Sequence, residues 1–173
     1  MSLIVQKFGG SSVKNAESIR RVAGIIERTF RAGNDVIVVL SAQGDTTDDL
    51  IEKAQEINPR ASRREMDMLL STGEQISISL CAMELERRGL RCVSLTGWQA
   101  GVQTTSVYSD ARIKRIDPER IRSELDQHRI VLVAGGLGMM IPGTLTDVVG
   151  LALVAAVVAV QYLGAKREKA AIK

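Results

Sequence analysis

The sequence has few of the residues that carry redox, metal or stacking chemistry. Aromatic residues make up 3% of the 173 positions, and there are three prolines, two cysteines and one histidine. Cys81 and Cys92 lie in apolar stretches without the paired spacing of a zinc site. We expect them to be reduced thiols of the core, as is usual in a cytoplasmic protein. With so few aromatics, the core must be built from Val, Ile, Leu, Ala and Met.

Neither charge nor hydropathy indicates a nucleic-acid or membrane partner. The net charge is +3, and basic residues are interleaved with acidic ones, so no basic patch is predicted. No signal peptide is recognisable after Met1. The uncharged stretch from Val148 to Val160 has 13 residues, which would span about 20 Å as a helix, short of the roughly 30 Å of a bilayer core. We expect a buried helix within Asp147–Leu163.

Strand and helix patterns alternate along the chain. Apolar runs predict strands over Leu3–Lys7, Asp35–Ser41, Arg91–Leu95, Ile113–Ile116 and Ile130–Ala134. Helical periodicity predicts helices over Asn15–Arg31, Thr46–Ile57, Ser62–Leu70, Glu74–Arg88 and Pro118–Gln127. The helix that ends at Leu70 is expected to stop at a break, Ser71-Thr72-Gly73. The alternation predicts one three-layer α/β/α domain over residues 1–173, with a mostly parallel sheet.

Glycine, serine and threonine gather where four predicted strands end, in Lys7–Ser12, Ser41–Thr47, Thr96–Gly101 and Gly135–Gly138. Ligands bind beyond the carboxyl ends of parallel strands, so we expect a site at this edge. In Lys7–Ser12, glycines allow backbone N–H groups to approach a phosphate and the lysine supplies a positive charge. The Walker spacing is absent, and an ordinary tight turn remains an alternative interpretation of Gly-Gly-Ser-Ser.

Five segments together resemble the N-terminal catalytic part of the aspartate kinases. They are KFGGSS (7–12), VVLSAQGDTTDDL (38–50), REMDMLLSTGEQISISL (64–80), SLTGWQAG (94–101) and IDPERIRSELD (116–126). The resemblance is continuous over about residues 3–135 and implies the amino-acid kinase fold. It also implies a reaction in which the γ-phosphoryl group of ATP, with Mg²⁺, is transferred to the β-carboxylate of L-aspartate.

The resemblance implies roles for residues on the nucleotide side of the site. Lys7 would be the catalytic residue that neutralises the transferred phosphoryl group. Gly9, Gly10 and Ser11 would surround the phosphates with backbone N–H groups. Asp147 would stand for the aspartate of the family's Ser-Asp pair, which precedes an alanine-rich helix.

On the substrate side, the resemblance implies that Ser41 and Thr47 bind at the phosphate or amino-acid end of the cleft. Glu74, at the start of its predicted helix, would meet the α-amino group of aspartate. An N-cap at Ser71-Thr72 is the alternative interpretation of that segment. No protein ligand for a metal is implied, and no general base is needed, because a carboxylate is already a nucleophile.

The resemblance weakens after Gly135. The family's Arg-Gly-Gly loop is missing, as are the second half that encloses the adenine and the regulatory domains. We therefore expect weak or no turnover from this chain. An unpaired apolar edge at Ile130–Ala134 predicts a homo-oligomer. Two alternatives stay open: a non-catalytic or engineered α/β fragment with a structural role, and a kinase of the same fold with another acceptor.

Several single residues are assigned structural roles. Met66, Met68 and Met83 recur at helical spacing and are expected in the core. Trp98 is expected to pack within its loop, although a substrate could stack on it there. His128 is expected on the surface.

Overall fold

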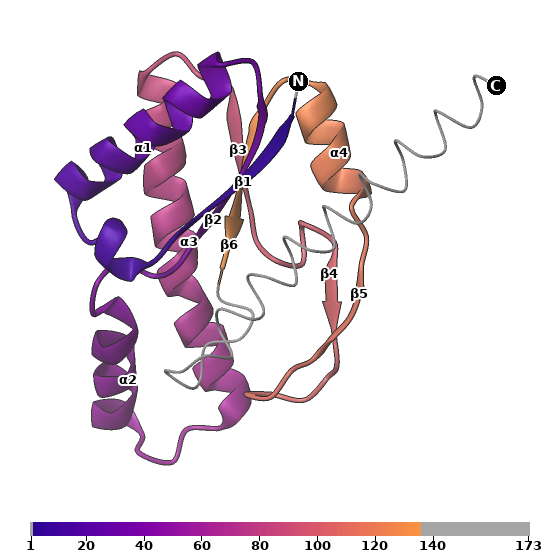
Figure 1. The fold of residues 1–173 in the computed structure, drawn as a ribbon. Coiled ribbons are helices and arrows are strands. Elements are labelled where there is room, and N and C mark those ends of the chain that lie inside the picture. Colours follow the sequence, from indigo (N-terminus) through magenta and orange to yellow (C-terminus); the bar gives the residue numbers. More distant parts are fainter. Residues whose placement is uncertain (1, 136–173) are drawn as a thin grey trace.

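The computed structural model describes residues 2–135, which form three layers (Figure 1). The central sheet is parallel, with strands in the order β1 (Leu3–Phe8), β2 (Asp35–Leu40), β6 (Ile130–Ala134) and β3 (Cys92–Leu95). One face is covered by helices α1 (Ala16–Arg31) and α3 (Arg63–Arg87), and the other by α4 (Glu119–Asp126). This is the predicted α/β/α arrangement.

Side chains of β2 and β6 alternate between two cores, because successive residues of a strand point to opposite faces. Val36, Val38 and Leu40 pack with α1 and α3, whereas Ile37 packs with α4. All of β2 from Val36 to Leu40 is buried. A strand covered on both faces requires the continuous apolar run that the sequence shows.

Most elements lie within a residue or two of their predicted ranges. Asn15 caps α1 by accepting a hydrogen bond from the backbone N–H of Ser18 at 2.9 Å. The helix α2 spans Thr46–Ile57, as predicted. A short 3₁₀ turn, η1 (Gly10–Ser12), follows β1.

The predicted break at Ser71-Thr72-Gly73 is wrong, because α3 runs unbroken from Arg63 to Arg87. The hydroxyls of Ser71 and Thr72 donate to the carbonyls of Met68 and Leu69, at 2.8 and 2.7 Å. Hydroxyls bonded within the preceding turn leave the helix intact. They are therefore not N-caps.

The expected open edge at Ile130–Ala134 is also wrong. β6 pairs with β2 on one side and with β3 on the other, so it is a central strand. The predicted strand Ile113–Ile116 exists as β5, but it pairs antiparallel with β4 (Val102–Thr104) in a separate hairpin. Within residues 2–135, the edges of the main sheet are β1 and β3.

The methionines of α3 are not core residues as expected. Met68 and Met83 are exposed, at 59% and 61%, and Met66 is half-buried. Cys81 is buried, Cys92 is half-buried, and both are free thiols. No helix among the described residues could cross a bilayer. The predicted helix Asp147–Leu163, and Asp147 itself, lie outside the described residues.

Candidate functional site

The turn after β1 brings backbone groups to the carboxyl edge of the sheet. The N–H groups of Ser12 and Val13 donate to the carbonyls of Gly9 and Gly10, at 2.9 and 3.1 Å. Gly10 is pressed against the loop after β2: a Cβ there would lie 2.6 Å from the carbonyl oxygen of Ala42. A Cβ at Gly9 would meet nothing within 4 Å. The loop therefore requires glycine at position 10 for close approach.

Hydrogen bonds tie the ends of β1, β2 and β6 together. The N–H of Ser41 donates to the carbonyl of Phe8 at 3.2 Å, and that of Gly44 to Gly10 at 3.1 Å. The N–H of Gly135 donates to Leu40 at 2.8 Å. Three strand ends thus form one connected edge.

Glu74 is the buried acid of this region. It lies in the middle of α3 and not at a helix start, and it is 4% exposed. Burial raises the pKa of its carboxyl group, and backbone hydrogen bonds from Glu74 itself and from Ala42 oppose that rise. The Ala42 bond links the carboxylate to the loop after β2. A buried carboxylate with a raised pKa at a sheet edge is typical of a functional group.

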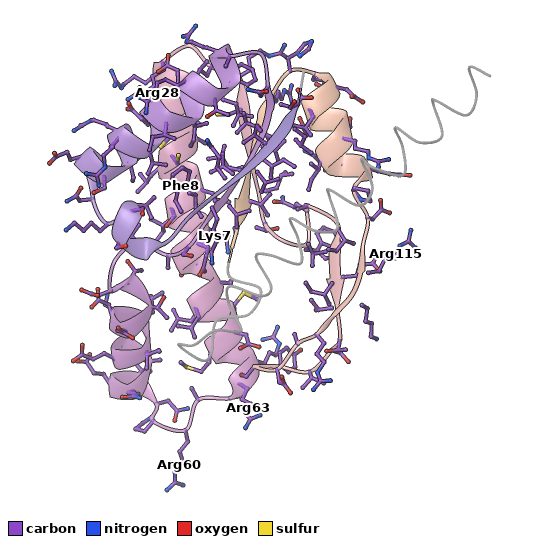
Figure 2. The ribbon with its side chains drawn as sticks, viewed as in Figure 1. Lys7, Phe8, Arg28, Arg60, Arg63 and Arg115 are labelled. Carbon is purple, nitrogen blue, oxygen red and sulfur yellow. The ribbon has the colours of Figure 1, made fainter. Side chains whose placement is uncertain are left out.

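The structure brings most of the predicted site residues to this edge. Lys7 is an exposed residue near the end of β1 (Figure 2), paired in register with Val39. Ser11 lies in the 3₁₀ turn, and Thr47 lies in the first turn of α2, which starts beside Gly73.

Sequence reasoning did not identify Ala42 or Gly73. A Cβ at Gly73 would lie 2.9 Å from the Cβ of Ala42, so α3 and the β2 loop touch where both residues are small. The Gly-Glu pair is a visible signal of close helix packing, whereas nothing marks Ala42 as the donor to Glu74. Trp98 does not pack as expected: it is 82% exposed.

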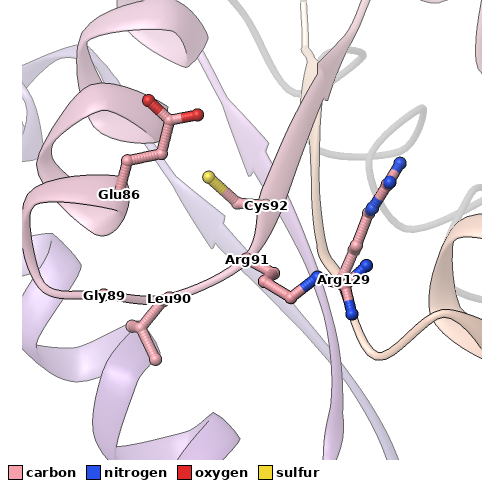
Figure 3. A pocket seen from close by; sticks show the side chains of 6 residues that line it. All are labelled: Glu86, Gly89, Leu90, Arg91, Cys92 and Arg129. Carbon is pink, nitrogen blue, oxygen red and sulfur yellow. The ribbon is translucent and has the colours of Figure 1, made fainter.

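Among the described residues, two cavities lie away from this edge. One of about 470 Å³ lies near the amino end of β3 and is lined by Glu86, Gly89, Leu90, Arg91, Cys92 and Arg129 (Figure 3). Burial raises the pKa of Cys92 to about 11, so its thiol stays protonated at neutral pH. None of the residues that line this cavity is a predicted site residue.

Metal ligands do not gather in the part of the chain that the structure describes. Within residues 2–135, no group of three or more His, Cys, Asp or Glu side chains could hold a metal ion.

Comparison with known proteins places these observations in a family. The sequence model of the Amino acid kinase family matches residues 2–167. The aspartokinase of Geobacillus stearothermophilus is 53% identical over 146 residues, which are 84% of this chain and 36% of the relative. That of Mycolicibacterium smegmatis is 55% identical over 139 residues, or 80% and 33%. The chain thus spans about a third of these curated relatives.

Solved structures agree with this assignment. Aspartate kinase from Synechocystis matches with a TM-score of 0.62 and 45% identity, over 76% of this chain and 21% of that one. E. coli aspartokinase III, solved with aspartate and ADP, matches with a TM-score of 0.64 over 80% of this chain and 41% of that one. At 20% identity, this match supports the fold alone. The fold is a parallel α/β sheet with glycine-containing loops at its carboxyl edge, and the family's sequence model matches nearly the whole chain. This chain therefore belongs to the amino acid kinase family.

Proposed function

We propose that the chain is the phosphate- and aspartate-binding part of an aspartate kinase, folded as one domain. The observation that carries the proposal is the contact of the β2 loop at Ala42 with both the β1 turn at Gly10 and the buried carboxylate of Glu74. The names of the curated relatives, all aspartokinases at about 50% identity, support the choice of substrate.

The reaction is an in-line phosphoryl transfer. A β-carboxylate oxygen of aspartate bonds to the γ-phosphorus of ATP, the bond from that phosphorus to the bridging oxygen breaks, and ADP leaves. The product is an acyl phosphate. Such chemistry depends on position and on charge neutralisation, which suits an edge built from a lysine and backbone N–H groups.

The proposed roles follow the arrangement at the edge. Lys7 neutralises the transferred phosphoryl group, and the Gly9–Ser11 backbone surrounds the phosphates. Ser41 and Thr47 bind between phosphate and amino acid. Glu74 receives the α-ammonium group of aspartate, whose positive charge would pair with the buried carboxylate.

We further propose that Mg²⁺ arrives on the nucleotide. Magnesium keeps most of its water and is usually held by substrate phosphates and one or two carboxylates. The family resemblance offers Asp147 for nucleotide binding. Because the chain spans about a third of its curated relatives, we expect it to bind aspartate but to turn it over slowly or not at all. We also expect a cytoplasmic protein that forms homo-oligomers.

The test measures aspartate-dependent ADP release by the 173-residue chain and by Lys7→Ala. Lys53→Ala, which removes an exposed lysine from α2, is the matched control. We expect Lys7→Ala to lose at least tenfold in rate, about 1.4 kcal/mol of transition-state stabilisation, with the control unchanged. Equal rates in Lys7→Ala and the parent chain would remove the role of Lys7.

Thermal-shift titration tests binding where turnover is too slow to measure. A ligand that binds only the folded state raises the unfolding midpoint, so aspartate should stabilise the chain and Glu74→Ala should abolish that effect. A midpoint that neither aspartate nor Mg-ATP changes would favour the non-catalytic alternative. A shift with another amino acid in place of aspartate would favour a different acceptor.

A further inference from the structure

Two arginines lie next to each other where neighbouring strands of the main sheet begin. Arg91 directly precedes β3, and Arg129 directly precedes β6. The register pairs Cys92 with Ile130, and the N–H of Ile130 donates to the carbonyl of Arg91 at 2.9 Å. The backbones of the two arginines are therefore about one strand spacing apart, roughly 5 Å. They lie at the amino end of the sheet, opposite the edge that holds Glu74.

Both arginine side chains belong to the face of the sheet that α4 covers. Val93 and Val131, two residues further along each strand, pack in the core on the α4 side, and residues two apart in a strand share a face. Figure 3 shows the side chain of Arg91 extending from β3 toward the start of β6, where Arg129 lies. Both line the cavity of about 470 Å³.

Arg129 is held in place from α4. Its Nη1 donates to the carboxylate of Glu124 at 2.7 Å, and the same carboxylate accepts from Nε of Arg120 at 2.8 Å. The side chain of Glu124 is 5% accessible, and that of Arg129 is 33% accessible. A guanidinium group carries five N–H donors, so Arg129 has a fixed position and still has donors for a ligand.

Arg91 has no acidic partner within residues 2–135, because none of the ion pairs in that range includes it. Its side chain is exposed. Glu86 also lines the cavity, but it lies on α3, on the other side of β3 from the arginines (Figure 3). Like charges at adjacent positions of neighbouring strands repel each other. An anion bound between Arg91 and Arg129 would remove that repulsion.

The groups that line the cavity suit a phosphate group on a small molecule. Each guanidinium presents parallel N–H donors that match a pair of phosphate oxygens, and two arginines balance the double charge of a phosphate ester. A cavity of this volume is in the range that holds small molecules. Leu90, which is 7% exposed, and the protonated thiol of Cys92 supply an apolar wall for the rest of such a ligand.

We propose that this cavity binds a small phosphorylated molecule, with Arg91 and Arg129 as the residues that hold its phosphate group. The site is separate from the proposed aspartate kinase site, because β6 runs from Arg129 at this cavity to Gly135 at the carboxyl edge of the sheet. Binding here does not depend on aspartate kinase activity.

The first test is a ¹H–¹⁵N NMR titration of the full chain with inorganic phosphate near neutral pH, at an ionic strength held constant with sodium chloride. We expect the amide signals of Arg91, Cys92 and Ile130 to shift and to saturate. Phosphate bound at the turn after β1 would instead shift the signals of Gly9–Ser11, so the two sites are read separately. Signals at the amino end of β3 and β6 that do not move through tens of millimolar phosphate would overturn the proposal.

The second test compares variants in the same titration. Arg91→Ala should weaken phosphate binding about tenfold or more, because it removes a charged bidentate donor. Arg91→Lys should restore part of the affinity, since lysine keeps the charge but not the paired donors. Arg122→Ala, which removes an exposed arginine of α4 that does not line the cavity, is the matched control and should bind like the parent chain. Equal affinities of Arg91→Ala and the parent chain would contradict the proposal.

Two further arms test the second arginine and the class of ligand. Arg129→Gln can still donate to Glu124 but has no charge, so it should bind phosphate as weakly as Arg91→Ala. Acetate, titrated under the same conditions, should shift the same signals less, because it carries a single charge. Unchanged phosphate binding by Arg129→Gln would overturn the role of Arg129, and equal affinity for acetate and phosphate would overturn the assignment to phosphate.

Discussion

At the scale of single residues, Gly9 and Gly10 differ in the space around them. The Cβ of an alanine at position 10 would lie 2.6 Å from the Ala42 carbonyl oxygen, whereas position 9 is open and has an ordinary φ of −76°. We expect Gly10→Ala to lower the free energy of unfolding by about 1–3 kcal/mol and Gly9→Ala to change it by no more than about 0.5 kcal/mol. Urea denaturation of both variants measures the difference.

The substitution at position 10 should also affect the loop that contacts Glu74. If the close approach of Gly10 to Ala42 matters as the distances indicate, Gly10→Ala also moves the loop that contacts Glu74. A Gly10→Ala protein as stable as Gly9→Ala would show that the β2 loop moves aside at little cost.

Burial of Glu74 disfavours its charged carboxylate, and this lowers the free energy of unfolding at a pH where the group is ionised. Its folded-state pKa is raised above 4.5, mainly by burial, so the folded protein binds a proton more tightly than the unfolded chain does. Stability from this group is therefore full below the unfolded pKa and falls as pH rises through the folded pKa. Glutamine keeps an oxygen that accepts from the Ala42 N–H and carries no charge.

We therefore expect Glu74→Gln to be more stable than the parent chain near neutral pH. The difference should disappear at about pH 4. Thermal unfolding of both proteins across this range measures it. A loss of stability in Glu74→Gln at neutral pH would mean that the charged carboxylate has a stabilising partner.

Single residues of the site were predictable where a residue type has a restricted chemical use. A lysine at the end of a strand, paired glycines and a glutamate in a family motif all indicated the edge of the sheet. Ala42 carries no such signal, because it acts through a backbone N–H. Met68, Met83 and Trp98 were misassigned since periodicity shows which residues share a face and not whether that face is covered.

At the scale of elements, α1 and α3 are joined by buried and half-buried ion pairs. Arg88 donates to Glu84 of α3 and to Glu27 of α1, both at 2.9 Å, and Arg87 donates to Glu84 at 2.7 Å. Glu84 is only 9% exposed. The hydrogen bond from Arg87, followed by that from Arg88, lowers its pKa to about 2.

A lowered pKa gives stability that is complete above the carboxyl group's ordinary pKa of 4.5 and is lost as pH falls through about 2. We expect Glu84→Gln to cost about 1–2 kcal/mol at neutral pH, and less as the solution is acidified. Glu86→Gln, on the exposed side of the same helix, is the control and should behave like the parent chain. Chemical denaturation at several pH values would contradict this if Glu84→Gln and the parent differed equally at all of them.

Element ranges were largely predictable, because hydrophobic periodicity and N-cap residues are local signals. The length of α3 was not. Ser71, Thr72 and Gly73 are poor helix formers in isolation, but packing of Gly73 on Ala42 keeps the helix continuous. The hairpin partner β4 is three residues long, which is too short to show a strand pattern.

At the scale of the whole molecule, the order β1-β2-β6-β3 was not predictable from the sequence. Apolar runs identify buried strands, but they do not say which strands are neighbours. We expect a chain that ends after Arg129 to lose cooperative thermal unfolding, since it lacks β6. One that ends after Gly135 should retain it. Calorimetry compares the two, and a cooperative transition in the shorter chain would contradict the central role of β6.

The central position of β6 also sets the order in which the sheet can form during synthesis. β2 and β3 are made first, but they are not neighbours, and the strand that joins them lies about ninety residues after β2. Within residues 2–135, β6 is the strand that pairs with β3, and it contributes side chains to both cores. Until Ile130–Ala134 leaves the ribosome, β3 lacks that partner and both cores are incomplete. Such long-range pairing is slow, so the nascent chain exposes apolar strands until β6 has been made, and it is most prone to aggregation during that interval.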